Sequence, residues 1–212
     1  MTLKVGINGF GRIGRMTLRS IIEQNRKNLE VVAINNKGNA EISSFLLAND
    51  TIHGKLKSKI NHSEKAINID GKKINMIHEI EISKIDWKKY KVNVVLECTG
   101  KFNTKEKSSQ HINSGANKVI VSAPCKGTKS IIYGVNEKNL KSSDQVISAA
   151  SCTANCLVPV AQTLNEDFAF VLNFPVHSKT TLTLYFFQSI FEISVSFIMS
   201  IFFPLISIDF SV

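Results

Sequence analysis

The beginning of the chain alternates a short apolar run, a glycine-rich turn and a helical pattern. The apolar run spans 3–7 and the turn spans 8–14, after which apolar residues recur at helical spacing as far as Ile22. A second apolar run at 29–34 has too few polar positions for a strand with one face in water, so it predicts a strand buried in a parallel sheet. Together these segments predict a βαβ unit.

Patterns further along the chain extend this sheet. An alternating segment at 67–76 surrounds Asp70-Gly71, the pair that a two-residue hairpin turn prefers. A polar helix is expected between Thr104 as its N-cap and Gly115 just beyond its end. Further short strands are predicted at 92–96, 118–121, 131–135 and 146–148. Strands that alternate with helices predict an α/β fold with a doubly wound, mostly parallel Rossmann-type sheet and a small antiparallel hairpin excursion.

Composition and charge exclude some classes of function. The chain has 212 residues, enough for a domain with a real core, and 26 Lys+Arg against 17 Asp+Glu give a formal net charge of +9. The lysines are scattered, with no basic run and no interleaved aromatic residues, so no nucleic-acid partner is expected. Small anionic ligands explain the positive charge equally well.

The cysteines form neither a CxxC pair nor a zinc-ligand spacing; they are Cys98, Cys125, Cys152 and Cys156. No metal site is therefore expected. Nothing before Leu3 resembles a signal peptide, and this use of cysteine is typical of a reducing compartment. We therefore expect a cytoplasmic protein with free thiols.

The glycine turn has the GxGxxG pattern of a dinucleotide site, directly after a buried strand and at the start of a helix. In this pattern Gly9 permits the tight turn, Gly11 lets the backbone approach a pyrophosphate, and Gly14 allows the helix to pack closely on the strand. The helix N-terminus offers free N–H groups and a partial positive charge to the phosphates. The alternative is a plain flexible turn, which the strand-turn-helix context disfavours.

The acidic residue that usually reads the adenosine ribose is absent at the end of the second strand. Ile34 is followed by Asn35, Asn36 and Lys37. Asn36 can hydrogen-bond the ribose hydroxyls, but it repels a 2′-phosphate less than a carboxylate does, and Lys37 can attract one. The residues by themselves leave the choice between NAD and NADP open.

A cysteine-containing turn follows the last predicted strand. It leads into an apolar helix, so Cys152 falls at a helix N-terminus, where the macrodipole and free N–H groups favour the nucleophilic thiolate. Ser151 and Thr153 offer hydroxyls to an anionic substrate group. Cys156, one turn further on, is expected to be a small core residue. The alternative for Cys152 is a cysteine that only caps the helix.

Six ordered motifs together resemble one family. They are VGINGFGRIGR at 5–15, NDTIHGK at 49–55, ECTGKF at 97–102, KVIVSAP at 118–124, YGVN at 133–136 and ASCTANCL at 150–157. With these motifs the chain resembles the glyceraldehyde-3-phosphate dehydrogenase family from residue 3 to about 167. The resemblance implies an NAD(P)-binding Rossmann domain at 1–150 and the start of a catalytic domain, with its nucleophile helix, at 151–167. The remainder of the family's catalytic half is missing or replaced, so a truncated second domain is expected.

The resemblance also implies a reaction and the residues that serve it. The family carries out phosphorylating, NAD-linked oxidation of a small phosphorylated aldehyde, through a hemithioacetal and a thioester that inorganic phosphate cleaves. Cys152 matches its nucleophile, and Ser151 and Thr153 match residues that hold phosphate groups. The family's cofactor-binding positions match Gly9, Gly11, Arg12, Ile13, Gly14, Asn36, Thr99, Gly100 and Ser122, with Asn36 where the family usually has aspartate. NAD is the implied cofactor, and NADP stays open.

The resemblance ends abruptly near Asp167. The family's catalytic-base segment and second phosphate site have no match, so turnover by this chain alone is not implied. A homotetramer, which the family forms mainly through its catalytic domain, is not expected of this chain either. Two alternatives stay open: a non-catalytic nucleotide-binding remnant in which Cys152 is only a reactive thiol, and a relative of erythrose-4-phosphate dehydrogenase.

Residues 168–212 have no family match and a different composition. All 11 glycines precede this tail, whereas ten of the 13 phenylalanines lie in it. Such a break favours the product of a shifted reading frame or of an intron. The apolar stretch is long enough for a membrane anchor, but Glu192 near its middle and the lack of flanking basic clusters weigh against membrane contact. His177 lies near the expected position of the base, but its neighbours do not match, so it is assigned no role.

Overall fold

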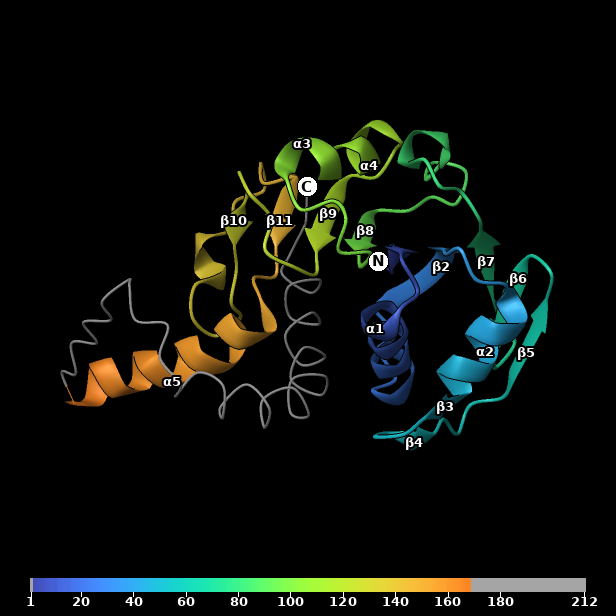
Figure 1. Ribbon diagram of the computed structural model, residues 1–212, viewed down its shortest axis with the longest axis horizontal. Coiled ribbons are helices and arrows are strands. Elements are labelled where there is room, and N and C mark those ends of the chain that lie inside the picture. Colours follow the sequence, from blue (N-terminus) through green and yellow to red (C-terminus); the bar gives the residue numbers. More distant parts are fainter. Residues whose placement is uncertain (1, 169–212) are drawn as a thin grey trace.

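The computed structural model describes residues 2–168, which build one sheet with helices on both faces (Figure 1). Within that range the sheet has nine strands in the order β10-β11-β9-β8-β1-β2-β7-β6-β5, and a separate ribbon pairs β3 with β4. The strands are β1 (Leu3–Asn8), β2 (Leu29–Asn35), β3 (Asn49–Asp50), β4 (Gly54–Lys55), β5 (Ile60–Ser63), β6 (Ala66–Ile69), β7 (Lys72–Ile77), β8 (Val94–Glu97), β9 (Lys118–Val121), β10 (Lys129–Ser130) and β11 (Val146–Ser148). The helices are α1 (Arg12–Glu23), α2 (Ala40–Ala48), α3 (Lys105–Ser108), α4 (Gln110–Asn113) and α5 (Cys152–Phe168), with short 3-10 turns at Ile82–Lys84 and Glu137–Asn139.

Parallel pairing dominates the sheet. β1 lies between β2 and β8 and is parallel to both; β7 continues the parallel arrangement beyond β2, and β9, β11 and β10 continue it beyond β8. The chain fills one side of β1 before it crosses to the other, so the strand order reverses between β1 and β8. Open α/β sheets bind ligands at such a point, at the carboxyl ends of the strands. The predicted α/β fold with a doubly wound, mostly parallel Rossmann-type sheet is confirmed.

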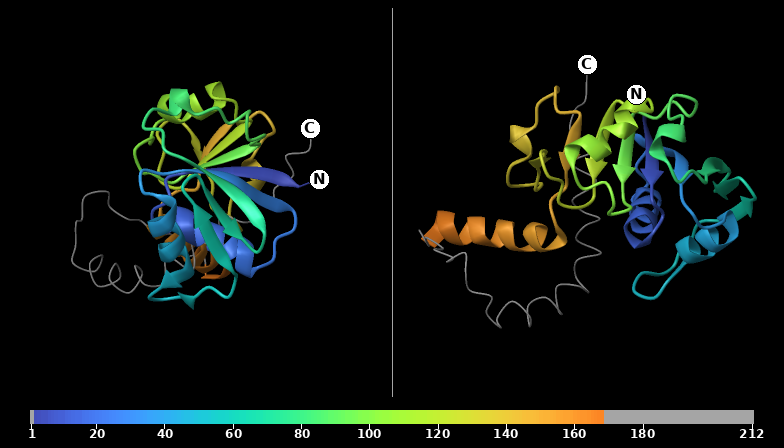
Figure 2. Two further views of the ribbon diagram at one scale, coloured as in Figure 1. Left: turned by 90° about the vertical axis from the view of Figure 1, so that its right-hand side faces the viewer. Right: turned by 45° about the horizontal axis from the view of Figure 1, so that its top comes forward.

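Alternate side chains of the central strands enter two separate cores. In β8, Val94 and Leu96 join the core that contains residues of α1 and α2, while Val95 joins the core that contains Trp87. Figure 2 shows α1 and α2 on one face of the sheet and α3 and α4 on the other. On the second face β1 presents Gly6, where an added Cβ would lie 2.7 Å from the Trp87 ring. The sheet is therefore covered on both faces, as the apolar strands predict.

The predicted hairpin excursion is confirmed. β6 and β7 pair in antiparallel register on either side of Asp70 and Gly71, whose φ angles are +50° and +84°. Two successive residues with positive φ are what a tight hairpin turn requires, and Asp-Gly is a preferred pair for it. β5 pairs with β6 and extends this antiparallel edge.

The predicted strand at 131–135 is wrong. The strand is β10, which ends at Ser130, and the chain then turns out of the sheet. Asn136 explains the departure, because its side chain accepts a hydrogen bond from the N–H of Ile132 at 2.7 Å and donates one to the carbonyl of Ser130 at 3.0 Å. These local side-chain bonds replace ladder pairing, and Gly134 with a φ of +83° completes the turn.

The predicted helix after Thr104 is present as two short pieces, α3 and α4, on either side of Ser109. The hydroxyl of Thr104 accepts a hydrogen bond from the N–H of Lys107 at 3.4 Å, and Gly115 has a φ of +104° just past the end. Both expected ends are therefore confirmed. The hydroxyl of Ser109 also donates to the carbonyl of Lys105 at 2.7 Å, a side-chain bond that competes with regular helix pairing.

The sequence patterns gave no sign of α2. Its N-cap is Asn39, whose side chain accepts a hydrogen bond from the N–H of Ile42 at 2.8 Å. Ile42 and Phe45 are exposed, whereas Leu47 on the same helix is fully buried. Apolar residues therefore surround the helix instead of forming one stripe, so the helical period is hidden.

Helix α5 begins at Cys152 and extends from the end of the sheet that carries β10 and β11 (Figure 1). Its apolar residues Leu157 and Val160 are exposed, and no helix among the described residues has the length and apolarity needed to cross a membrane. Beyond Phe168, the tail assigned to 168–212 lies outside the described residues, and His177 lies there too. The alternatives for this tail, a shifted reading frame, an intron or a membrane anchor, therefore stay predictions.

The hairpin turn makes a prediction about acid stability. Hydrogen bonds from the Ser58 side chain and from the N–H of Lys59, at 2.8 Å, hold the pKa of Asp70 below its usual range. A carboxyl whose pKa is lowered by folding stabilises the native state above its unfolded pKa of about 4, and this stabilisation is lost as the pH falls through the folded pKa. Asparagine also tolerates a positive φ. As the pH is lowered from about 5 to about 2, we therefore expect the melting temperature of Asp70→Asn to fall less than that of the parent.

Thermal denaturation of both proteins across that pH range measures the difference. Asp86→Asn is a suitable control, because Asp86 is also exposed and its side chain accepts a local backbone N–H, from Lys89 at 3.1 Å. An equal fall in melting temperature for the parent and Asp70→Asn over this pH range would contradict the prediction.

Candidate cofactor and thiol site

The turn between β1 and α1 contains two glycines at positions where no side chain fits. Gly9 has a φ of +93°, and a Cβ added there would lie 2.8 Å from the backbone nitrogen of Thr99. A Cβ added at Gly14 would lie 2.2 Å from the carbonyl oxygen of Gly9, far inside van der Waals contact. The first turn of α1 therefore packs directly on the end of β1.

A third glycine leaves the start of α1 open. Gly11 is the N-cap residue, no side chain caps the helix, and the first turn has no acidic residue. A Cβ added at Gly11 would meet no atom within 4 Å, so there is free space in front of the helix. The positive end of the helix dipole together with this space fits a bound phosphate group.

Two arginines beside this helix start have buried nitrogens that lack a partner among the described residues: Nε and Nη2 of Arg12, and Nε of Arg15. Burial and the nearby charge of Arg12 lower the pKa of Arg15. Burial would raise the pKa of Asp50, but hydrogen bonds from two backbone N–H groups, together with the charge of Arg12, hold it below its usual range. Buried donors without partners are costly, so the unpaired nitrogens also fit an anionic ligand.

Asn36 lies directly after β2 and contacts the glycine turn. Its Oδ1 accepts a hydrogen bond from the N–H of Phe10 at 3.4 Å, and its Nδ2 donates to the hydroxyl of Ser43 in α2 at 3.4 Å. Both are at the long limit for hydrogen bonds, so either can be exchanged for a ligand hydroxyl at little cost. Lys37, the next residue, carries its charge close to the same strand end.

The ends of β1, β2 and β8 are joined by a buried polar network that the sequence reasoning missed. Glu97, which is 1% exposed, accepts hydrogen bonds from Asn8 Nδ2 at 2.5 Å and from His111 Nε2 at 2.9 Å. Its other oxygen accepts the N–H of Thr99 at 2.8 Å and the Thr99 hydroxyl. Asn35 in β2 donates to Asn8 Oδ1 at 2.8 Å. Glu97 is a charged residue at the end of an otherwise apolar strand, and this position was the sequence feature that could have indicated its role.

The remaining predicted cofactor residues lie in the loops after β8 and β9. Gly100, with a φ of +71°, follows Thr99, and the N–H of Ser122 donates to the carbonyl of Glu97 at 3.0 Å. Between these loops burial and the charge of Glu97 raise the pKa of Cys98 to about 12, although a hydrogen bond with Ser122 opposes the shift. Cys98 is therefore a neutral thiol near pH 7 and is not the candidate nucleophile.

Cys152 is the first residue of α5 and is exposed. The hydroxyl of Ser151 accepts the N–H of Ala154 at 3.0 Å, so Ser151 is the N-cap of this helix. Thr153 Oγ1 lies 4.0 Å from the Cys152 sulfur. The preceding strand is tied to the loop that carries Ser122, because the hydroxyl of Ser148 donates to the carbonyl of Ala123 at 2.8 Å.

Cys156 differs from its predicted position in a core. It is only partly buried, and the next residue, Leu157, is exposed. Burial together with the nearby Cys152 raises the pKa of the Cys156 thiol. Cys125 is buried. Among the described residues, Cys152 is therefore the cysteine that solvent and reagents reach most readily.

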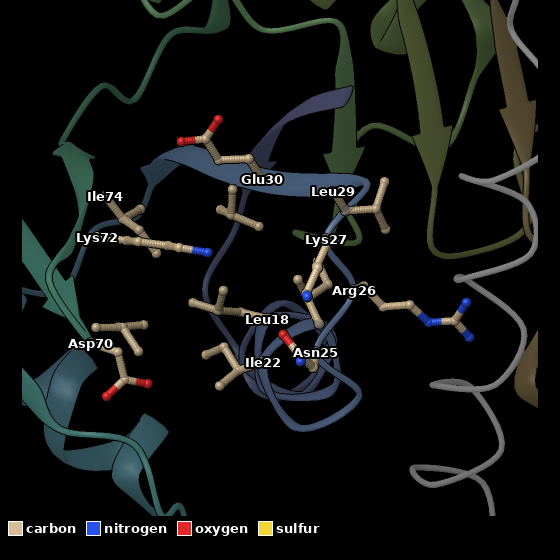
Figure 3. A pocket seen from close by; sticks show the side chains of 13 residues that line it. Leu18, Ile22, Asn25, Arg26, Lys27, Leu29, Glu30, Asp70, Lys72 and Ile74 are labelled. Atoms are coloured by element: carbon tan, nitrogen blue, oxygen red, sulfur yellow. The ribbon is translucent and has the colours of Figure 1, made fainter. Parts of the chain in front are cut away.

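A pocket of about 150 Å³ lies at the opposite edge of the sheet (Figure 3). Leu18, Ile22, Leu29 and Ile74 line it, and Asp70 of the hairpin turn stands at its rim. Because Leu29 begins β2, this pocket is at the amino ends of the parallel strands. It is separate from the glycine turn and from Cys152.

The predicted residues thus gather at one edge of the sheet. Those assigned to the cofactor follow β1, β2, β8 and β9, and those assigned to the reaction follow β11, which is the neighbour of β9. This geometry defines a dinucleotide-binding α/β protein with a cysteine-bearing helix at the carboxyl edge of its sheet.

Comparison with known proteins makes the identification more specific. Residues 3–105 match the family model described as glyceraldehyde 3-phosphate dehydrogenase, NAD binding domain. The glyceraldehyde-3-phosphate dehydrogenase of Cereibacter sphaeroides is 43% identical over 183 residues, which cover 85% of this chain and 54% of that relative. The enzyme of the same name from Zymomonas mobilis subsp. mobilis is 43% identical over 184 residues, and the plasmid enzyme of Cupriavidus necator is 44% identical over 187 residues, each covering 85% of this chain and 55% of the relative.

The chain is therefore a glyceraldehyde-3-phosphate dehydrogenase-like protein with an NAD-binding domain. It spans about half the length of the curated relatives that it matches.

The two glycines at the helix start make a matched pair for a stability test. Gly14→Ala is expected to lower the free energy of unfolding by about 1 to 3 kcal/mol, because its Cβ would lie 2.2 Å from a backbone oxygen and the helix must shift. Gly11→Ala is expected to stay within about 0.5 kcal/mol of the parent, because its Cβ meets no atom and its φ of −71° is ordinary. Urea denaturation of both variants measures the difference, and similar values would refute the close packing of α1 on β1.

Proposed function

We propose that this chain provides the NAD-binding site and the nucleophile for phosphorylating oxidation of a small phosphorylated aldehyde. The observation that carries the proposal is the position of Cys152, exposed at the N-terminus of α5, on the same sheet edge as the glycine turn. A thiol at a helix N-terminus is stabilised in its nucleophilic form by the macrodipole. The names of the relatives support the same reaction class.

The residues present fit NAD. The open start of α1 and the unpaired nitrogens of Arg12 suit the pyrophosphate, and Asn36 suits the adenosine ribose. Gly9, Ile13 and Gly14 shape that turn, while Thr99, Gly100 and Ser122 line the strand ends beside it. When bound, NAD would be the oxidant that accepts a hydride from the substrate carbon.

The chain's own chemistry centres on the sulfur of Cys152. The thiolate adds to the aldehyde carbon, a C–S bond forms, and the carbonyl oxygen gains a proton, which gives a hemithioacetal. Loss of a hydride from that carbon and of the hydroxyl proton leaves a thioester. Inorganic phosphate then attacks the thioester carbon, the C–S bond breaks, and an acyl phosphate leaves as the thiolate is restored.

Ser151 and Thr153 are proposed to hold phosphate groups beside the sulfur. The Ser151 hydroxyl accepts the helix N–H of Ala154, and its own proton is still available for an anion. Thr153 Oγ1 is close to the sulfur, at 4.0 Å. A phosphate bridging these hydroxyls would lie at the positive end of α5.

A second candidate is a nucleotide-binding module without turnover. It is favoured by one observation: among the side chains that the structure describes, those of residues 2–164, no histidine or carboxylate makes a hydrogen bond with the Cys152 sulfur. Cytoplasmic location, the substrate's identity as glyceraldehyde or erythrose phosphate, and the expected lack of a homotetramer stay predictions, as do the domain limits at 150 and 167.

Substitution of the nucleophile separates the two candidates. The parent is assayed for NADH formation from NAD, glyceraldehyde 3-phosphate and inorganic phosphate; where the parent forms NADH, we expect Cys152→Ser to reduce this rate on the order of a thousandfold or more while it still binds NAD. Cys156→Ser is the matched control, since Cys156 is in the same helix and its raised thiol pKa makes it a poor nucleophile. Absorbance at the NADH band gives the rate, and calorimetry gives NAD binding.

Each outcome has a distinct meaning. NAD binding without phosphate-dependent NADH formation in the parent would favour the non-catalytic module. A parent chain that does not bind NAD would contradict both candidates. Equal loss of rate in the two cysteine variants would remove the specific role of Cys152.

Asn36 gives a prediction about cofactor choice. Asn36→Asp would place a carboxylate beside the adenosine ribose, so NADP binding is expected to weaken about tenfold more than NAD binding. Ser43→Ala is the control, because it removes the hydroxyl that Asn36 contacts at 3.4 Å without adding charge. Calorimetric titration with both nucleotides measures the ratio; an unchanged ratio would show that Asn36 does not lie at the ribose.

A further inference from the structure

The turn that precedes Cys152 has an unusual backbone. Ala150 has a φ of +60°, in the left-handed region that residues with a Cβ seldom adopt. It is 6% exposed and stands between the last residues of β11 and the N-cap of α5. A left-handed alanine persists only where surrounding contacts hold it.

Asn155 provides such contacts from inside the helix. Its Nδ2 donates to the carbonyl of Ala149 at 2.8 Å and to the carbonyl of Ser151 at 2.8 Å, so the amide spans Ala150. The side chain is 4% exposed, and its Oδ1 is buried without a partner in the described residues. The reversed amide would put Oδ1 against two carbonyl oxygens, so the orientation with Nδ2 toward the turn is fixed by chemistry.

Bonds to neighbouring strands hold the other side of the turn. The N–H of Ala150 donates to the hydroxyl of Ser148 at 3.0 Å, and the N–H of Ala149 donates to the carbonyl of Val121 at 2.9 Å. These bonds fix the turn to β11 and β9 but not to α5. The N-cap hydroxyl and the carbonyl of Ser151 bond the helix N–H groups of Ala154 and Asn155, and the bond that reaches past Ala150 to Ala149 comes from the Asn155 side chain.

We propose that Asn155 is a positioning residue for Cys152. By holding Ala150 in its left-handed conformation, the Asn155 amide fixes where α5 begins and keeps the Cys152 sulfur at the helix N-terminus and at the cofactor edge. This inference rests on the proposed role of Cys152 as nucleophile. It assigns Asn155 no contact with substrate or cofactor.

Side-chain chemistry restricts what can replace Asn155. Two donors on one short side chain are needed to reach both carbonyls. Serine keeps one donor and alanine keeps none. Aspartate would bring a carboxylate against two carbonyl oxygens.

The experiment compares alkylation of Cys152 by iodoacetamide in the full chain and in Asn155→Ala, Asn155→Ser and Thr163→Ala, with the modified cysteine identified by mass spectrometry. Thr163→Ala is the matched control, because the Thr163 hydroxyl also bonds a carbonyl within α5, that of Pro159 at 3.1 Å, but far from the turn. We expect Asn155→Ala to react about fivefold more slowly at pH 7, with its pH–rate profile displaced toward alkaline pH, because the sulfur no longer stays at the helix N-terminus. Asn155→Ser should be intermediate, and Thr163→Ala should match the parent.

A second pair of variants tests the link to Ala150. Ala150→Gly adopts a positive φ without help, so Asn155→Ala should change the alkylation rate less in that background than in the parent. Thr163→Ala should have the same effect in both backgrounds. Melting temperature and NAD binding are followed for every variant, so that loss of the fold is distinguished from loss of positioning.

The outcomes are decisive for the inference. Asn155 variants that melt lower but keep the parent's alkylation rate and pH profile would show a purely structural residue and overturn it. Lack of any coupling between positions 150 and 155 would also overturn it. Failure of the parent to form NADH would count against the proposed reaction, whereas the ratio of alkylation rates between variants would still report on positioning.

Discussion

The buried carboxylate of Glu97 is the interaction on which the candidate site depends. Removing a charged group from water is costly unless donors replace the lost water, and here four donors from Asn8, His111 and Thr99 do so. The donors come from the end of β1, from α4 and from the loop after β8. One group therefore fixes the relative positions of the strand end, the covering helix and the loop that would face the cofactor.

The direction of the hydrogen bonds in this network is determined by its outermost member. Trp87 Nε1 can only donate, and it donates to His111 Nδ1 at 3.1 Å. The proton of a neutral His111 is then on Nε2, where it is donated to Glu97 at 2.9 Å. The chain Trp87–His111–Glu97 thus links the second core to the carboxyl edge of the sheet.

The sequence predicted features that depend on backbone conformation better than features that depend on side-chain contacts. The glycine turn and the Asp70 hairpin were predictable because a positive φ and a close backbone approach leave few residue types that fit. The strand at 131–135 was not, because the Asn136 side chain competes with the sheet in a way that no periodicity records. Helix α2 was hidden because Phe45 and other apolar residues lie on its exposed face.

The candidate site shows the same division. Gly9, Gly14 and Cys152 could be assigned from local pattern, since each is required by its own turn or helix end. Glu97 could not be, because its role comes from partners that the fold brings to it. Asn155 could not be either, although Ala149 and Ser151 are only six and four positions away, because no sequence pattern indicates the left-handed conformation of Ala150 that its side chain spans. One partner of Glu97, Asn8, is 89 positions away in the chain.

Three of the turns at this edge of the sheet also show why the cysteine turn needs a side chain to support it. The chain leaves β1 through Gly9 and β8 through Gly100, both with positive φ, and glycine adopts that conformation at no steric cost. It leaves β11 through Ala150, which has the same sign of φ but a Cβ. In the first two turns the residue with positive φ is one that adopts this conformation without strain, whereas the third has bonds from Asn155 and Ser148 around an alanine. The turn that presents the thiol is therefore the one in which a side chain of the following helix, that of Asn155, bonds on both sides of the left-handed residue.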